Sequence, residues 1–248
     1  MLKYNIGVFM DNNLAKRFLK AYNLLDYTIK NLYNFKRGMP FSDCIRRAVP
    51  LNSVIRRFED DLVDFSRLRN AIVHSSSNDE EIIAIPKQEV VEKLEHITKL
   101  IATPPKVYDT VCRKDVMCVE SNVSVKETIG LIGKSGFSNL PVYKDGMILG
   151  VANGQKILNK IANVINENKD VCEFINKTPI EEIVSGEKES FYTIQSKDLT
   201  ISEALNIFYE NRKLLVILIT PNGNFLEMPI GILTTSDILD INKILENY

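Results

Sequence analysis

The stretch from Gly231 to Leu239, with the sequence GILTTSDIL, is typical of a junction between a β-strand and an α-helix. The free N–H groups of a first helical turn favour an anionic oxygen, while Thr234, Ser236 and Asp237 offer two hydroxyl groups and a carboxylate. One short carboxylate beside one anion-binding point suits the diol of a ribose. The stretch is compatible with a ribose and phosphate site, and equally with a helix cap made by Ser236 or Asp237.

The same pattern occurs twice in the second half of the chain, with the second copy starting 76 positions after the first. Each copy predicts a strand, a helix, a strand, a turn, a strand and a helix, with the turns at Asp145-Gly146 and Asn222-Gly223. An internal repeat of this length indicates two copies of one supersecondary unit. The matching segments are Val123–Ile129 with Leu199–Leu205, Leu140–Tyr143 with Leu215–Leu218, and Gly150 with Gly231.

This order of elements resembles the CBS domain, whose tandem pairs form Bateman modules. Further residues support the resemblance: the Lys114–Met117 segment (KDVM) precedes the first copy's opening strand, and Leu140–Val142 (LPV) forms its second strand. The resemblance covers about residues 106–247. It implies an adenosine-containing ligand, such as AMP, ADP, ATP or S-adenosylmethionine, in the cleft between the copies.

The resemblance also assigns roles to residues of the second copy. Asp237 would hold the ribose hydroxyls, and Thr234 and Ser236 would lie near the ribose or the phosphate. Gly231 belongs to the same motif. The strand Tyr192-Thr193-Ile194 would flank the base, with backbone groups at the adenine edge and Tyr192 or Ile194 against its face.

The first copy departs from this motif in the stretch GVANGQK, from Gly150 to Lys156. Asn153 stands where the hydroxyl belongs, and Lys156 stands where the aspartate belongs. A lysine cannot accept a hydrogen bond from a sugar hydroxyl, so we expect one adenosine site per chain. Lys156 itself is either a solvated lysine of the first helical turn or a cation that faces a phosphate across the cleft.

The first hundred residues predict an all-helical bundle, because apolar residues recur at steps of three and four. Helices are expected at about 14–33, 55–72 and 88–101, with a short one after Ser42. Asn12 or Asn13 would cap the first helix. Counting the short helix after Ser42 as the second, Asn52 or Ser53 would cap the third helix, at 55–72. A short extended piece is expected at 82–85. Pro104-Pro105 indicates a linker.

The predicted fold class is therefore α + α/β, a helical bundle followed by two CBS-type β-α-β-β-α units. The expected domains are a helical domain over 1–103, a linker at 104–105, and a CBS pair over 106–248. Within the pair, the first copy spans 106–177 with an added helix, and the second spans 178–248.

The end of the third predicted helix contains a chemically suggestive group, Arg69, Asn70 and His74. Asn70 and His74 are four residues apart and share a helix face, with Arg69 at its edge. A guanidinium, an amide and an imidazole can stabilise a phosphorane and transfer a proton, as cleavage of RNA by its own 2′-hydroxyl requires.

Arg69 followed by His74 resembles the Arg-x4-His motif of HEPN domains. These are small helical bundles that often dimerise, and their active members cleave RNA without a metal. The resemblance makes Arg69, Asn70 and His74 candidate catalytic residues. The alternative is a plain helix end, with His74 as a cap and Arg69 paired with one of three acidic residues, Asp60, Asp61 or Asp64.

Charge and composition bound the partners. The chain has a net charge of −1, whereas Leu14–Arg69 carries twelve Lys or Arg against six Asp or Glu, a balance of +6. This basic region is either a solvated face or a surface for RNA. Four scattered cysteines and two histidines predict no metal site and suggest core residues in a reducing compartment. No signal peptide or membrane span is expected, so the predicted location is cytoplasmic.

Three functions are compatible with these observations. The first is an adenosine-nucleotide-sensing regulatory protein, in which a ligand in the CBS-pair cleft controls the N-terminal helical domain. The second, the alternative to the first, is a nucleotide-gated HEPN-type endoribonuclease that needs no metal. The third is a structural dimer with an unused cleft. Both resembled families pair symmetrically, which implies a homodimer.

Overall fold

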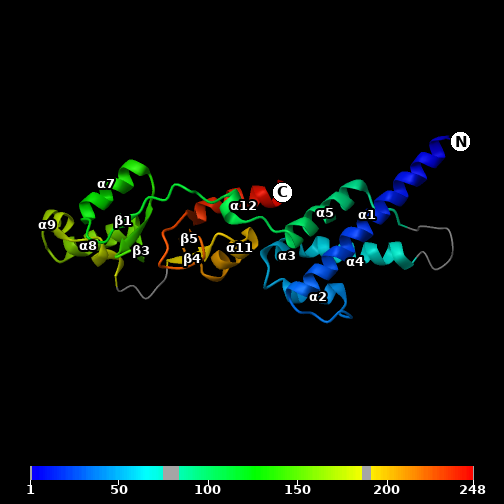
Figure 1. The fold of residues 1–248 in the computed structure, drawn as a ribbon, viewed down its shortest axis with the longest axis horizontal. Helices are drawn as coiled ribbons and strands as arrows, with labels where there is room; N and C mark the ends of the chain where they lie inside the picture. Colours follow the sequence, from blue (N-terminus) through cyan, green and yellow to red (C-terminus); the bar gives the residue numbers. More distant parts are fainter. Residues whose placement is uncertain (1, 75–83, 186–190, 248) are drawn as a thin grey trace. The chain divides into compact units, whose positions relative to one another are not determined.

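A computed structural model describes residues 2–74, 84–185 and 191–247 of the chain (Figure 1), and only the helical backbone for 2–12 and 74. The chain divides into two compact units. The first contains residues up to Pro105 together with Thr200–Asn206 and the chain from Asn242 on. The second contains Lys106–Leu199 and Ile207–Ile241.

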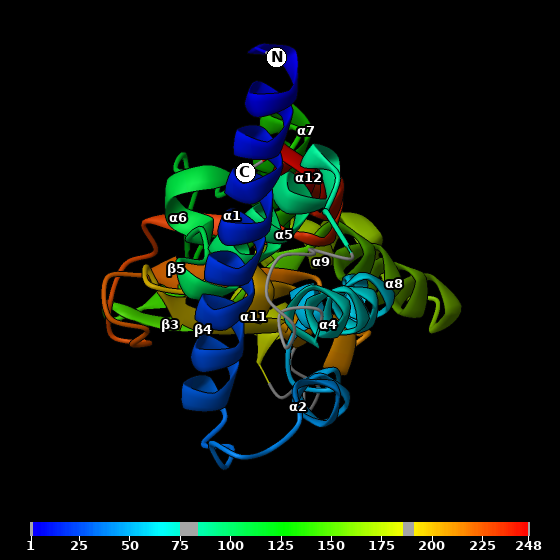
Figure 2. The same ribbon diagram turned by 90° about the vertical axis from the view of Figure 1, so that its right-hand side faces the viewer.

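The N-terminal part of the first unit is helical, as predicted. α1 packs along α5 (Figures 1 and 2). Each helix contributes fully buried side chains to one core, including Phe18, Ile45, Ile55, Leu62 and Leu94. The helices are α1 (Leu2–Leu32), α2 (Phe41–Ala48), α3 (Ser53–Arg57), α4 (Glu59–His74) and α5 (Gln88–Ala102).

The start of α1 differs from the prediction. The helix begins at Leu2, so Asn12 and Asn13 lie inside it and do not cap it. The preceding residues contain no proline, and without a helix breaker a polar residue that favours a cap does not oblige the helix to start there. The sequence pattern therefore located the apolar stripe correctly but placed the first residue of the helix too late.

The third predicted helix is in fact two helices, α3 and α4, which are separated at Phe58. Asn52 caps α3, because its Oδ1 accepts hydrogen bonds from the backbone N–H groups of Val54 (2.9 Å) and Ile55 (3.1 Å). α4 then starts with three acidic residues, 59–61, which favour a helix N-terminus. Residues 75–83, which include the first half of the extended piece predicted at 82–85, lie outside the described residues, and residues 84 and 85 are not in a strand.

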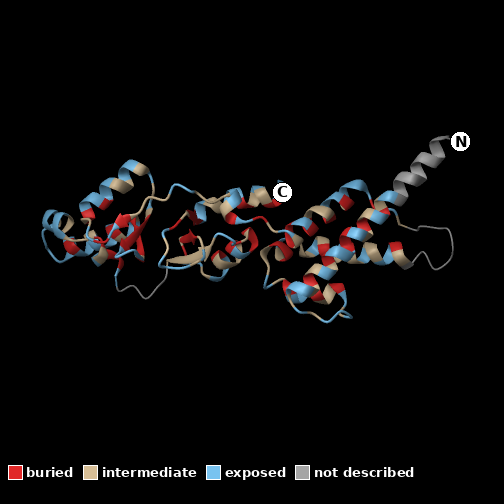
Figure 3. Cartoon of the chain, viewed as in Figure 1, coloured by how far each residue is buried: buried red, intermediate tan, exposed pale blue. Residues whose placement is uncertain are grey.

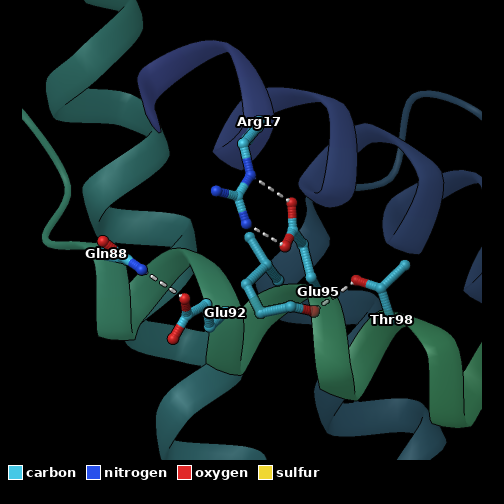
Figure 4. A network of polar contacts seen from close by, with 6 residues as sticks. Arg17, Gln88, Glu92, Glu95 and Thr98 are labelled. Carbon is cyan, nitrogen blue, oxygen red and sulfur yellow. Dashed lines mark hydrogen bonds and ion pairs between the residues drawn. The ribbon is translucent and has the colours of Figure 1, made fainter. Parts of the chain in front are cut away.

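A bidentate ion pair joins α1 to α5 (Figure 4). Arg17 Nε donates to Glu95 Oε1 at 3.0 Å, and Arg17 Nη2 donates to Glu95 Oε2 at 2.6 Å. The hydrogen bond from Arg17 lowers the pKa of Glu95 below its ordinary value. On the same helix, the Thr98 hydroxyl donates to the carbonyl of Leu94 at 2.7 Å. The geometry fixes the rotation of the two helices against each other.

The first unit also includes parts of two helices from the second half of the chain, α11 (Ile201–Glu210) and α12 (Ile238–Asn247). Arg57 donates to Asn242 Oδ1 at 2.7 Å and to Glu246 Oε1 at 2.8 Å. The predicted boundary at 103–106 therefore leaves out segments that pack with the helical domain.

The second unit contains both copies of the repeat, and each forms a three-stranded sheet. In both sheets the first two strands are parallel and the last two antiparallel. The first copy has β1 (Val119–Glu120), α7 (Val125–Ser135), β2 (Asn139–Lys144), β3 (Met147–Asn153) and α8 (Gly154–Asn166). The second has β4 (Tyr192–Ser196), α11, β5 (Val216–Thr220), β6 (Gly231–Thr234) and α12; the connections add α6 (Val107–Thr110), α9 (Val171–Lys177) and α10 (Glu181–Val184).

The two predicted turns differ. Asp145 and Gly146 have φ angles of 52° and 78° and join β2 directly to β3, as an Asp-Gly hairpin turn should. Gly223 also has a positive φ, 79°, but β6 begins only at Gly231. The chain turns at Asn222-Gly223 as predicted, but residues 221–230 form a longer loop before β6.

The buried residues of the second unit gather on the strands (Figure 3). The core of the first copy includes Ile180, Ile183 and Val184, so this copy extends beyond the predicted boundary at Lys177. A second cluster joins the two sheets; it contains Tyr143, Ile148 and Val151 from the first copy and Val216, Leu218 and Ile232 from the second.

The cysteines and the helices bear on two further expectations. Cys44 is buried and Cys112 and Cys118 are partly buried, but Cys172 is exposed, so the expectation of four core cysteines is wrong for Cys172. Among the described residues, no helix combines the length and the apolar character that a membrane span requires.

Candidate functional site

The site is built around the end of β6. All four residues of this strand are buried, and the chain then makes a 3₁₀ turn at Thr235–Asp237 before α12 begins. Asp237 Oδ2 accepts hydrogen bonds from the Thr234 backbone N–H (2.7 Å) and hydroxyl (2.9 Å). The Ser236 hydroxyl lies 2.9 Å from the Thr234 hydroxyl. Asp237 therefore does act as a cap.

The capping role does not use the whole carboxylate. A carboxylate has two oxygens with about four acceptor positions, and both bonds from Thr234 go to Oδ2. Within the part of the chain that the structure describes, Asp237 Oδ1 makes no hydrogen bond. The two interpretations of this stretch, a cap and a ligand site, are thus compatible with each other.

A cavity of about 120 Å³ lies beside this junction. The second copy contributes its strand end and the two hydroxyls, and the first copy contributes the segment before β1 and the loop before β2. Asp237 is not among the lining residues. The second copy supplies Ile232, Thr234 and Ser236; the first supplies Arg113, Asp115, Val116, Met117, Gly136, Phe137, Ser138 and Asn139.

The segment before β1 is held against β6 by its backbone. The Arg113 N–H donates to the carbonyl of Ile232 at 3.1 Å, and the Ile232 N–H donates to the carbonyl of Arg113 at 2.9 Å. Beside them, a Cβ atom on Gly231 would overlap the Sγ atom of Cys112. Gly231 is therefore required by this close approach. Burial raises the pKa of the Cys112 thiol to about 11.

In the first copy, the equivalent glycine is also packed closely under another segment, but a different residue contacts it. A Cβ atom on Gly150 would lie 3.0 Å from the Cβ atom of Val184, in the segment that leads to the second copy. Gly150 and Gly231 thus align in sequence because each lies beneath the segment that precedes the other copy. This explains the glycine of the repeat by sterics.

Tyr192, Thr193 and Ile194 do not line the cavity. Tyr192 and Ile194 pack instead on the apolar cluster that joins the two sheets. The repeat offset of 76 positions equates Tyr192 with Val116 and Thr193 with Met117, and these two residues do line the cavity. The assignment of Tyr192, Thr193 and Ile194 to the base stays a prediction, while the equivalent residues of the first copy are the ones that line this cavity.

The junction of the first copy holds a cation of its own. Asn153 caps α8 by accepting hydrogen bonds from the N–H groups of Gln155 (2.9 Å) and Lys156 (3.3 Å), and it donates to Asn139 Oδ1 at 2.8 Å. Lys156 Nζ lies 3.9 Å from the centre of the Phe191 ring. Lys156 is therefore half-buried against an aromatic ring and is not a simply solvated lysine.

The candidate catalytic group in the helical domain is only partly described. Arg69 Nη1 donates to Asn70 Oδ1 at 3.3 Å, and Asn70 is exposed. His74 is the last residue of α4, and its side chain lies outside the described residues. Two of the three acidic partners proposed for Arg69 are engaged elsewhere, since Asp61 pairs with Lys93 and Asp64 with Arg67. The catalytic assignment stays a prediction.

Comparison with known proteins gives a family match for the first copy of the repeat. Residues 107–163 match the family model of the CBS domain, and this segment contains all of the first copy's cavity-lining residues. No curated protein matches the chain.

Similar solved structures cover about half of the chain. One is the CBS domain pair of protein MJ0100 in complex with 5′-methylthioadenosine and S-adenosyl-L-methionine (19% identity, 56% of this chain and 97% of that chain, TM-score 0.42). Another is an uncharacterized conserved protein from Pyrococcus horikoshii (22% identity, 56% and 93%, TM-score 0.43). A third is a CBS-domain containing protein from Agrobacterium tumefaciens (15% identity, 55% and 98%, TM-score 0.43).

Proposed function

We propose that this chain is a tandem CBS protein that senses an adenosine-containing ligand and thereby regulates its N-terminal helical domain, as a homodimer. The observation that carries the proposal is the cavity at the end of β6. It combines the hydroxyls of Thr234 and Ser236 with apolar and aromatic groups of the first copy, Val116, Met117 and Phe137. Ligand sites of this kind are mostly apolar with a few well-placed polar groups.

The chemistry of the lining fits a nucleoside. Val116, Met117 and Phe137 offer apolar and aromatic surface to a planar base, and Thr234 and Ser236 offer hydroxyl groups to a ribose or a phosphate. Asp237 does not line the cavity but follows Ser236 directly, which does, and its Oδ1, which accepts no hydrogen bond among the described residues, is the proposed acceptor for the ribose diol. The match of residues 107–163 to the CBS domain supports the same class of ligand.

The test is calorimetric titration of the full chain with AMP, ATP and S-adenosylmethionine. Asp237→Asn keeps an oxygen that can cap Thr234 but removes the charge. Charge-assisted hydrogen bonds contribute about 1.5 to 3 kcal/mol, so binding should weaken on the order of tenfold or more. Asp237→Ala should weaken it at least as much. Lys156→Ala is the matched control in the first copy and should change affinity much less.

Unchanged affinity in both Asp237 variants would contradict the assignment. Native mass spectrometry of the same samples would report the number of subunits and any retained nucleotide together. A monomer with a bound nucleotide would remove the homodimer from the proposal and leave the ligand site intact.

A further inference from the structure

Arg113 is a cation fixed at the cavity. Its backbone makes two reciprocal hydrogen bonds with Ile232 of β6, at 3.1 and 2.9 Å, so its Cα position is set by the sheet of the second copy. Its guanidinium carbon lies 4.7 Å from the centre of the Phe137 ring, and both residues line the cavity. Stacking of this kind holds the guanidinium plane in place while leaving the N–H groups at its edge available.

The charge of Arg113 is not neutralised by a neighbouring acid. Among the described residues, no carboxylate forms an ion pair with Arg113 and no acceptor takes a hydrogen bond from its guanidinium. Other arginines of the chain differ: Arg17 pairs with Glu95, and Arg57 pairs with Glu246. A guanidinium has five N–H donors in a planar fork, and with no carboxylate of the described residues bonded to it this fork can receive an anion.

One carboxylate does share the cavity lining. Asp115 lies two residues from Arg113 and is exposed, whereas Arg113 is half-buried. Water and salt screen an exposed charge more strongly than a partly buried one. The side chain of Arg113 therefore dominates the electrostatic character of the cavity toward a ligand that enters it.

We propose that Arg113 binds an anionic group of the ligand, and that the ligand is an adenosine 5′-phosphate rather than adenosine or an S-adenosyl compound. The inference rests on the proposed function and concerns the same site. A nucleotide has a diol, which matches Asp237, and a phosphate, which matches the planar fork of an arginine. Adenosine lacks an anion. S-adenosylmethionine has a carboxylate that could meet the fork, but its sulfonium and ammonium give it a positive net charge, which the guanidinium repels.

The experiment is calorimetric titration of the full chain with AMP, adenosine and S-adenosylmethionine. The wild-type protein should bind AMP about tenfold or more tightly than the other two ligands. Arg113→Gln should lower the affinity for AMP to that for adenosine and leave adenosine binding unchanged. Arg113→Lys keeps the charge without the fork and should retain only part of the preference. Lys114→Gln removes a neighbouring exposed cation and should change neither affinity.

Three results would overturn the inference: equal binding of AMP and adenosine by the wild type, tighter binding of S-adenosylmethionine than of AMP, or an equal loss of both ligands in Arg113→Gln. The last result would mean that Arg113 only supports Phe137. Thermal denaturation of each variant identifies a folding defect, and Arg113→Lys then decides the question. If the wild type binds none of the three ligands, the proposed function itself fails.

Discussion

The junctions of the two copies both lead from a strand with a covered glycine into a helix, and they differ in the charge at one equivalent position. In the second copy, the aspartate at position 237 accepts two hydrogen bonds from Thr234 and keeps one oxygen free. In the first copy, the lysine at position 156 lies over the Phe191 ring. A repeat therefore specifies the strand, the glycine and the helix cap, while a single side chain decides whether the junction can accept a hydrogen bond from a sugar.

The largest effect is expected from crowding at the two repeat glycines. Gly231→Ala should destabilise the fold by about 1 to 3 kcal/mol, because the new methyl group overlaps Cys112 Sγ. Gly150→Ala should cost less, since its methyl group would lie 3.0 Å from Val184. Denaturant unfolding would measure both.

Two variants control this comparison. Gly130→Ala in α7 has open space around the new methyl group and should stabilise the helix by about 0.5 to 1 kcal/mol. Cys112→Ala combined with Gly231→Ala should recover most of the lost stability. No recovery in the double variant would show that the close approach to Cys112 is not the reason for Gly231.

The next effect concerns the number of ligands per chain, given the proposed function. The wild type should bind one ligand per chain, because a lysine cannot accept a hydrogen bond from a ribose. Lys156→Asp should add a second, weaker site, because it puts a carboxylate where the second copy has Asp237 and removes the cation over Phe191. Calorimetry reports the stoichiometry, and Lys156→Ala should still bind one ligand. A single site in Lys156→Asp would mean that the junctions differ by more than charge.

The smallest expected effect is a dependence of folding stability on pH. It distinguishes Cys112, which packs on Gly231, from Val184, which packs on Gly150. Burial raises the pKa of Cys112 from its ordinary value of 9.0 to about 11, whereas Val184 does not titrate. The folded state then holds the thiol proton more tightly than the unfolded state, so stability is full below pH 9 and declines between pH 9 and 11. The loss at pH 10 should be less than about 1 kcal/mol.

The control must remove the titration of this thiol alone. Cys112→Ala should decline less than the wild type between pH 9 and 10.5 in denaturant unfolding. Cys118, whose pKa burial also raises to about 11, stays present in both proteins and contributes equally. Identical slopes in the two proteins would contradict the assignment of this loss to Cys112.

Much of the fold followed from the sequence, because helix stripes, capping residues and a repeat in register are local patterns. Local patterns failed where the chain had two acceptable choices. An asparagine in the middle of a helix-forming run did not start α1, and the Asn222-Gly223 turn did not close a tight hairpin. In each case a favourable residue permitted a feature that the rest of the segment did not require.

The site was predictable only on one side. Thr234 and Ser236 line the cavity, as their place at a strand end suggested. Arg113 and Phe137 also line the cavity but were not singled out, and Tyr192 lies outside it, because a repeat equates positions without saying which copy faces which junction. That information comes from the packing of the two sheets on each other. It is absent from any single window of the sequence.

The two segments that cover the repeat glycines have a consequence for dividing the chain into its two copies. The segment with Cys112 and Arg113 precedes the first copy but covers β6, and Val184 precedes the second copy but covers Gly150 of β3. A polypeptide with only one copy would lack the segment that packs on its own glycine-containing strand, and this strand would be exposed. Its own leading segment would have no strand of the other copy to pack on. Two such single-copy chains would cover each other's glycines reciprocally, as the halves of a symmetric dimer do. The two copies expressed as separate chains should accordingly refold only when they are mixed.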